Sequence, residues 1–451
     1  MRKNFSPTVK GIRIELVKYL ITTIVAILIC IPSIFLGAAL YKYGYITKYG
    51  QSLDSFSDEI LLTINNLLRP QNNSEASDDS VSSYKLITNN YEFNLTSYYT
   101  NSMDIYGGID IYHDKLYFLD GQGNMRVLEN EMFNEIEFPL VDSKLREFNL
   151  DFGVNFPDFS IKDMIFGKKD NEEHIFISHI EYDQIKKCYF LSVASSKINT
   201  KDGEINFDKF ENLFQSKPCL GPHPKDGIRG FAGTSSGGKL SISKNGIYVS
   251  IGDFYFDGVN ANNATNLTSD YGKIIFIDFQ SSNKNIIASG LRNPQGMVLT
   301  SLGLFETEHG PQGGDEFNKI NLNKRLNYGW PEASYGVDYE TYQWPKDPNN
   351  NNHYLFKEPI YFWTPSIGVS NLDYFENESE FKLWRGDFLI SSLRSLSLFR
   401  VRMDNLNENL IGIETINLGF RVRDIKIHKD KIYLLEDSIP VRIHILDKVE
   451  L

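Results

Sequence analysis

The sequence predicts an all-β domain, most simply a β-propeller, that follows one N-terminal transmembrane helix and a short stalk. Three observations support this fold class. Aromatic residues make up 13% of the 451-residue chain, with 25 Tyr and 31 Phe, a composition that suits half-buried strands. Alternating strands with tight turns recur after about residue 90, where helical periodicity is scarce. A long uncharged run lies near the N-terminus.

That run, YLITTIVAILICIPSIFLGAAL at 19–40, has 22 residues, enough to cross a hydrocarbon layer of about 30 Å. Residues 1–18 hold five Lys or Arg and only one acidic residue, Glu15. The positive-inside rule therefore predicts a single-pass protein with a cytoplasmic N-terminus and an exported, periplasmic or extracellular, domain. A signal peptide cleaved near the GAA at 37–39 is the alternative, although the apolar run is longer than a usual signal peptide core and so favours an uncleaved anchor.

A stalk and linker are predicted over 41–89. Residues 52–70 have apolar side chains at helical spacing and a Pro stop, whereas 71–84 is polar and rich in Ser, Asn and Asp. The folded domain is expected over 90–451.

Within that domain, three segments repeat one pattern of strand, short polar turn and second strand: 109–128, 240–254 and 425–446. These are predicted β-hairpins, and 272–279 and 385–401 add similar strands. Repeated hairpins over this length predict radial repetition, in which six blades would take about 60 residues each. A large jelly roll or a pair of β-sandwiches is the structural alternative.

The bulk properties exclude several classes of function. A net charge of −12 argues against nucleic acid as a partner, because there is no basic excess to neutralise phosphates. No phosphate-binding loop, serine-hydrolase elbow or H-E-x-x-H zinc motif is present. Of the three cysteines, Cys30 lies in the apolar run, so Cys188 and Cys219 either pair, which would imply an oxidising compartment, or remain two buried thiols.

Polar clusters stand out in three regions of the strand background. They are GLRNPQG at 290–296; ETEHGPQGGDE at 306–316, continuing into NYGWPEASYGVDY at 327–339; and WRGDFLISSLRSLSLFRV at 384–401 with RVRD at 421–424. Each cluster alone could be a turn or a solvated surface.

Together and in this order, these motifs resemble the glucose/sorbosone dehydrogenase family, which comprises soluble quinoprotein glucose dehydrogenases and aldose sugar dehydrogenases. The resemblance covers about 230–446, and the stretch from 100 to 229 matches only in strand rhythm. It implies a six-bladed β-propeller that holds pyrroloquinoline quinone (PQQ) and Ca²⁺ over its central axis. The implied reaction is oxidation of the anomeric hydroxyl of an aldose sugar, or of a related alcohol, outside the cytoplasmic membrane, with a membrane electron acceptor as a further partner.

The resemblance also assigns binding residues. The quinone contacts map to Arg292, Asn293, Tyr339, Arg394, Arg421 and Arg423. Calcium would be held by the main-chain carbonyls of Gly310 and Pro311 and by Glu316 and Tyr328. The residue types suit the ligands, because guanidinium groups pair with the carboxylates of the quinone and Ca²⁺ prefers oxygen. His309 is expected to be structural, since Ca²⁺ prefers oxygen ligands and rarely binds imidazole.

The catalytic base of the family has no counterpart. In GFAGTSSGGKLSIS at 230–243, the position of the family's general-base histidine is taken by Ser235, which cannot act as a base near neutral pH without an activator. His223 and His179 are candidate substitutes. The sequence therefore leaves open a dehydrogenase with a rearranged base, a sugar- or quinone-binding protein without turnover, and a protein-interaction propeller.

Overall fold

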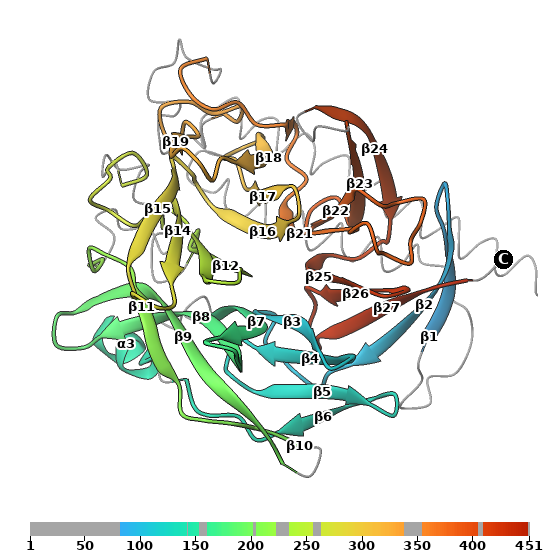
Figure 1. The fold of residues 1–451 in the computed structure, drawn as a ribbon, viewed down its shortest axis with the longest axis horizontal. Coiled ribbons are helices and arrows are strands. Elements are labelled where there is room, and N and C mark those ends of the chain that lie inside the picture. Colours follow the sequence, from blue (N-terminus) through green and yellow to red (C-terminus); the bar gives the residue numbers. More distant parts are fainter. Residues whose placement is uncertain are drawn as a thin grey trace, which may run out of the picture. The chain divides into compact units, whose positions relative to one another are not determined.

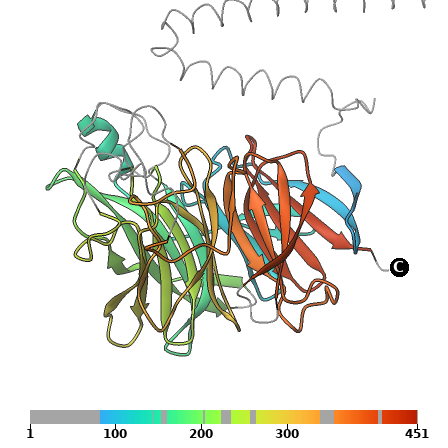
Figure 2. The same ribbon diagram turned by 90° about the horizontal axis from the view of Figure 1, so that it is seen from above.

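The computed structural model describes residues 82–141, 143–152, 160–201, 204–221, 234–255, 263–337, 354–404 and 409–449. They belong to a compact unit that spans Val81–Leu451. The described residues form six β-sheets arranged radially around one axis (Figure 1), and Figure 2 shows them from the side, with strands running from one face of the ring toward the other. The predicted six-bladed propeller is confirmed, and the jelly-roll and sandwich alternatives are excluded.

The predictions for the N-terminal region fall outside this part of the chain. The anchor at 19–40, its cytoplasmic flank at 1–18 and the stalk helix at 52–70 are not among the described residues. Within the described ranges, no helix has the length and apolar character needed to span a bilayer. The first strand begins at Ser82, ahead of the expected start of the domain near residue 90.

Each blade is a sheet of four or five strands, antiparallel except where β15 pairs with β19. Blade 1 contains β3 (Gly107–Tyr112), β4 (Lys115–Asp120), β5 (Met125–Glu129) and β6 (Met132–Ile136). Blade 2 contains β7 (Ile161–Lys169), β8 (Glu172–Asp183), β9 (Cys188–Lys201), β10 (Glu204–Phe207) and β11 (Glu211–Gln215). Helix α3 (Leu145–Phe152) connects blades 1 and 2.

The remaining blades repeat this plan. Blade 3 contains β12 (Gly237–Ile242), β13 (Gly246–Ile251), β14 (Lys273–Asp278), β15 (Lys284–Ser289) and β19 (Leu326–Asn327). Blade 4 contains β16 (Pro294–Thr300), β17 (Gly303–Glu308), β18 (Asp315–Ile320) and β20 (Tyr361–Trp363). Blade 5 contains β21 (Val369–Tyr374), β22 (Asp387–Ser392), β23 (Ser397–Met403) and β24 (Leu410–Asn417). Blade 6 contains β25 (Val422–His428), β26 (Lys431–Glu436), β27 (Arg442–Lys448), β2 (Glu92–Tyr99) and β1 (Ser82–Ile87).

The ring is closed in blade 6, where both ends of the domain meet in one sheet. Strand β2 pairs antiparallel with β27, so that Leu95 faces Leu446 across the pair. This pairing joins the N-terminal strands to the C-terminal hairpin through backbone hydrogen bonds, and it removes one open edge that an unclosed ring would expose.

The turns of the predicted hairpins explain how the blades fold locally. His113 and Asp114, which connect β3 to β4, have φ angles of 46° and 62°, in the left-handed region that two-residue hairpin turns require. The strands on either side bury Ile109 and Phe118 completely. Between blades, the rings of Phe305, Phe317 and Phe388 pack within 5.9 Å of one another, so that neighbouring sheets share an aromatic core.

Cys188 and Cys219 form a disulfide, with their Cα atoms 5.6 Å apart. The bond ties the start of β9 to the segment that follows β11. Of the two possibilities that the sequence left open, the structure contains the pairing.

Candidate functional site

The main candidate site is a central pocket of about 190 Å³ at the face where the innermost strands of all six blades begin. One residue from each innermost strand illustrates how the ring builds it: Gly107, Lys162, Lys239, Gln295, Ser370 and Asp424. Because every blade contributes, the pocket lies over the propeller axis, where the resemblance places the cofactor.

The wall of the central pocket is cationic. Lys162 and Arg423 line it, and a third lining cation, Lys239, is paired with Asp163 and with the one lining carboxylate, Asp424. The ring of Tyr106 contacts two of these cations, with its centroid 4.8 Å from Lys162 Nζ and 5.4 Å from the guanidinium carbon of Arg423. These two cation–π contacts help to hold the two charges in place. In a protein with a net charge of −12, this is a local surface suited to an anion.

The two arginines of RVRD are held together by one carboxylate. Asp437 accepts from Arg421 at 2.8 Å and lies 3.1 Å from a terminal nitrogen of Arg423. Only Arg423 reaches the central pocket, and its Nε is buried without a hydrogen-bond partner. Burial tends to raise the pKa of Asp437, but the two guanidinium groups outweigh it and lower that pKa, so the carboxylate stays charged. Arg421 therefore acts on the pocket through Asp437.

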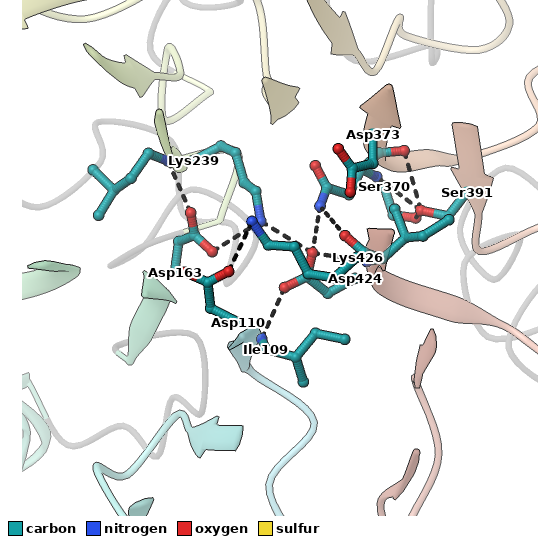
Figure 3. Close-up of polar contacts among 12 residues, drawn as sticks. Ile109, Asp110, Asp163, Lys239, Ser370, Asp373, Ser391, Asp424 and Lys426 are labelled. Carbon is teal, nitrogen blue, oxygen red and sulfur yellow. Dashed lines mark hydrogen bonds and ion pairs between the residues drawn. The ribbon is translucent and has the colours of Figure 1, made fainter. Parts of the chain in front are cut away.

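A network of ion pairs joins the innermost strands of several blades (Figure 3), and two of its members, Lys239 and Asp424, line the central pocket. Lys239 Nζ donates to Asp163 at 2.9 Å and to Asp424 at 3.0 Å, which joins strands of blades 2, 3 and 6. Lys426 pairs with Asp110 at 3.1 Å. Burial raises the pKa of Asp163 to about 6, although Lys239 opposes that rise. This network was not predicted from the sequence, in which its only signal is an acidic or basic residue within strands that are otherwise apolar.

A second, smaller cavity of about 10 Å³ gathers the residues expected to bind calcium. Gly310, Pro311, Glu316 and Tyr328 all line it, although they come from two separated stretches of the sequence. Its volume is close to the ~10–15 Å³ that one water-sized particle needs.

Arg292 lies in this second cavity, not in the central pocket. Its Nη1 donates to the carbonyls of Gly310 at 2.7 Å and His309 at 3.1 Å. The guanidinium also lies over the rings of Trp330 and Tyr255, at 5.4 Å and 5.5 Å. Because a carbonyl has two lone pairs, Gly310 keeps one for a further ligand. The structure thus places Arg292 behind the turn at 309–311, and His309 lines both cavities.

The second cavity is strongly acidic. Burial raises the pKa of Glu316 well above its ordinary value, and the charge of Glu308 adds to the rise. Burial likewise raises the pKa of Glu308 to about 7. Glu306, behind them on β17, has one carboxyl oxygen without a hydrogen-bond partner. A cation would relieve this mutual repulsion.

The oxygen atoms around the second cavity suit calcium, provided that Tyr328 contributes its main-chain carbonyl and not its hydroxyl. Among the described residues, no three His, Cys, Asp or Glu side chains lie close enough together to hold a metal on their own. A cation here would need main-chain carbonyls beside a carboxylate, which is a mixture that Ca²⁺ accepts. The hydroxyl of Tyr328 donates to the carbonyl of Lys319 at 2.8 Å and accepts from the amide of Asn321. Its main-chain carbonyl is therefore the better donor to a metal.

The remaining predicted residues are divided between the pocket and the rest of the fold. Asn293 and Ser235 line the central pocket, and Asn293 accepts from the amide of Gly237 beside it. Arg394 is exposed in the turn after β22 and does not line the pocket. Tyr339 and His223 lie outside the described residues.

His179 cannot serve as the substitute base, because it is buried in the second strand of blade 2, away from the lining of the central pocket. Burial lowers its pKa to about 4. The lining residues that went unnoticed in the sequence include Tyr106 and Lys162. These two lie just before or at the start of innermost strands. Only the closed ring brings these strand ends together around the pocket.

Comparisons with known proteins agree with this architecture. Residues 165–444 match the family model described as Glucose / Sorbosone dehydrogenase. The aldose sugar dehydrogenase YliI of Escherichia coli is 32% identical over 168 residues, which cover 36% of this chain and 44% of that protein. An uncharacterized protein of Synechocystis, slr1608, is 33% identical over 191 residues, covering 39% and 45%. The chain thus matches less than half the length of each relative.

Solved structures show the same fold. The soluble aldose sugar dehydrogenase of Escherichia coli in its apo-form superposes with a TM-score of 0.61 at 20% identity, covering 79% of this chain and 100% of that one. A glucose dehydrogenase superposes with a TM-score of 0.60, also at 20% identity, covering 79% and 99%.

Proposed function

Because the chain belongs to the glucose/sorbosone dehydrogenase family, we propose that it oxidises an aldose sugar or a related alcohol with PQQ and Ca²⁺. The observation that carries the proposal is the pair of adjoining cavities. One is a cationic pocket over the axis, and the other is an acidic cavity that gathers all four residues expected to hold calcium. His309 lines both, so a ligand in one would adjoin a cation in the other.

The residues of the chain would bind and orient the reactants. Arg423 and Lys162 would pair with carboxylates of the quinone, and Tyr106 would keep both cations in position. Gly310, Pro311 and Glu316 would hold calcium. When bound, the quinone would accept a hydride from the sugar, and calcium beside it would stabilise the charge that arrives.

The proton released in this oxidation needs an acceptor, and this is where the chain departs from its family. Ser235 lines the central pocket at the position of the expected base, held in a left-handed conformation with φ of 55°. Loss of general-base catalysis typically lowers a rate by about 10²–10⁴-fold. Ser235 therefore favours a second candidate function, in which the propeller binds a sugar or quinone without turnover.

We further propose that the reaction takes place outside the cytoplasm, beside the membrane. The apolar run at 19–40 supports an anchor, and the Cys188–Cys219 disulfide is typical of an oxidising compartment. An anchored dehydrogenase could pass its electrons to an acceptor in the membrane.

The test is a spectroscopic titration of the full chain, purified without metal. Calcium and PQQ are added, and the quinone absorption is recorded before and after a panel of aldoses. Reduction by an aldose supports the dehydrogenase, and quinone binding without reduction supports the non-catalytic alternative. Absence of quinone binding refutes the dehydrogenase and leaves only binding of a sugar without turnover. Arg423→Ala should weaken binding, whereas Arg385→Ala, which removes an exposed arginine away from the pocket, should not.

A further inference from the structure

Lys273, the first residue of β14, is fully buried, with 0% of its surface exposed. Its Nζ donates to three main-chain carbonyls, those of Asn263 at 2.7 Å, Ala264 at 2.8 Å and Tyr271 at 2.7 Å. Lysines rarely lie this deep, because removing an ammonium group from water is costly unless it is well coordinated. Three inward-facing carbonyls around one positive charge are the arrangement that proteins also use to bind a metal ion.

This carbonyl cage, defined as the main-chain oxygens of Asn263, Ala264 and Tyr271, fixes the approach of two chain segments. The oxygen of Ala264 also accepts from the amide of Gly290 at 2.8 Å, so one carbonyl joins Lys273 to the end of β15. Gly272, with φ of 66°, lets the segments meet, because a Cβ there would lie 2.4 Å from Cβ of Ala264. The close contact needs both a glycine and a cation.

The cage leads to Arg292 through two contacts. Ala264 is fully buried and packs against Trp330. The indole nitrogen of Trp330 donates to Asp253 at 2.8 Å, and its ring lies 5.4 Å from the guanidinium carbon of Arg292. The orientation of Arg292, and with it that of the Gly310 carbonyl it contacts, therefore depends on Trp330, which rests on the cage.

We propose that Lys273 is a built-in cation that takes the place of a metal ion in a carbonyl cage and that it positions Arg292 through Ala264 and Trp330. It is a positioning residue, since it lines neither cavity. The existence of the cage is independent of the proposed function, whereas its effect on quinone affinity rests on that function.

The cage can be emptied and refilled. Lys273→Ala removes three methylenes and the ammonium, which together have the shape of propylammonium, so this ion can enter the space. Lys273→Met keeps the volume but provides no charge and leaves no room. Lys244→Ala removes a charge from an exposed turn and serves as the matched control.

The readouts are the thermal midpoint and the fluorine NMR spectrum of the full chain labelled with fluorotryptophan. The chain has four tryptophans, so Trp330→Phe identifies the resonance of Trp330. We expect Lys273→Ala and Lys273→Met to lower the midpoint by about 5 °C or more and to shift the Trp330 resonance. Propylammonium should restore both readouts in Lys273→Ala alone and leave Lys273→Met, Lys244→Ala and the unaltered protein unchanged.

The opposite results would overturn the proposal. They are a Lys273→Ala protein that propylammonium does not restore, or a Lys273→Met protein with an unaltered midpoint and Trp330 resonance. If Lys273→Ala does not fold, refolding only in the presence of propylammonium supports the cage, and refolding that is equally poor with and without it counts against it. A third readout, quinone affinity, should fall in Lys273→Met by about tenfold. If the unaltered protein binds no quinone, the proposed function fails, while the ammonium rescue still tests the cage.

Discussion

Replacing Lys239 by Met should expose how the axis is stabilised. Lys239 is a single ammonium between Asp163 and Asp424, at 2.9 Å and 3.0 Å, and both carboxylates are at most 3% exposed. Removing one partner of a buried ion pair costs about 3–5 kcal/mol, because the other charge remains without compensation. We therefore expect the free energy of unfolding to fall by about this amount at pH 8.

The loss in the free energy of unfolding should depend on pH, and the raised pKa of Asp163 determines the direction of that dependence. The pKa of Asp163 is raised to about 6 in the folded protein, above its value in the unfolded chain, so its contribution to stability is present at low pH and is lost as the pH rises. Without Lys239 that pKa rises further, and the carboxyl can take up a proton to remain neutral. The destabilisation should therefore grow by up to about 1.4 kcal/mol per pH unit between about pH 6 and pH 8.

The assay is denaturant unfolding followed by tryptophan fluorescence across this pH range. Lys115→Met is the control, because Lys115 pairs with Glu129 on the surface, with both side chains at least 39% exposed, and such pairs are worth about 0–1 kcal/mol. Adding Asp163→Asn to Lys239→Met should recover much of the loss by removing an uncompensated charge. A destabilisation that is the same at every pH, or that Asp163→Asn does not recover, would refute this account of the axis.

Four further outcomes follow from the structure. Ser235→His should raise sugar-dependent quinone reduction by about 10²–10⁴-fold, measured by stopped-flow absorption, if a base is all that the pocket lacks. Arg292→Lys should weaken quinone binding by about tenfold or more in an absorption titration, because a lysine cannot lie flat over the ring of Trp330 while it donates to the Gly310 carbonyl. Burial lowers the pKa of His179 to about 4, so stability from its neutral ring is lost as the pH falls below about 6.5, and His179→Asn should flatten that decline in unfolding curves. Replacing Cys188 and Cys219 by Ser, which opens a loop of 31 residues, should lower the free energy of unfolding by about 3–4 kcal/mol in denaturant titrations.

The fold was predictable because its information is local. A hairpin turn such as His113-Asp114 can be identified from a few neighbouring residues, and six blades repeat that pattern. The closure of the ring in blade 6 was not predictable in the same way. Pairing of Leu95 with Leu446 joins strands more than three hundred positions apart, and nothing in either strand specifies the other.

The site residues fall into the same two groups, those that local sequence motifs identify and those whose role depends on the tertiary structure. The motifs around Arg292, Gly310 and Glu316 identified residues that the fold does bring together, because each motif is continuous in sequence. The direction of a side chain is a tertiary property, so the sequence did not show that Arg292 lines the second cavity and hydrogen-bonds the turn at 309–311. Lys162 was missed for the same reason, since one lysine at the start of a strand is ordinary until six strand ends converge.

Buried charges are compensated differently in three parts of this propeller. The difference indicates which of these parts needs a bound ion. On the axis, Lys239 pairs with two carboxylates, and in the cage Lys273 donates to three carbonyls. In the second cavity, burial and the charge of Glu308 instead raise the pKa of Glu316, and Arg292 is turned toward main-chain carbonyls. A protein that elsewhere provides its own cations leaves this acidic cavity without enough of them. Calcium should therefore stabilise the chain at this cavity and not at the axis or the cage, where its charge would compete with a lysine that is already in place.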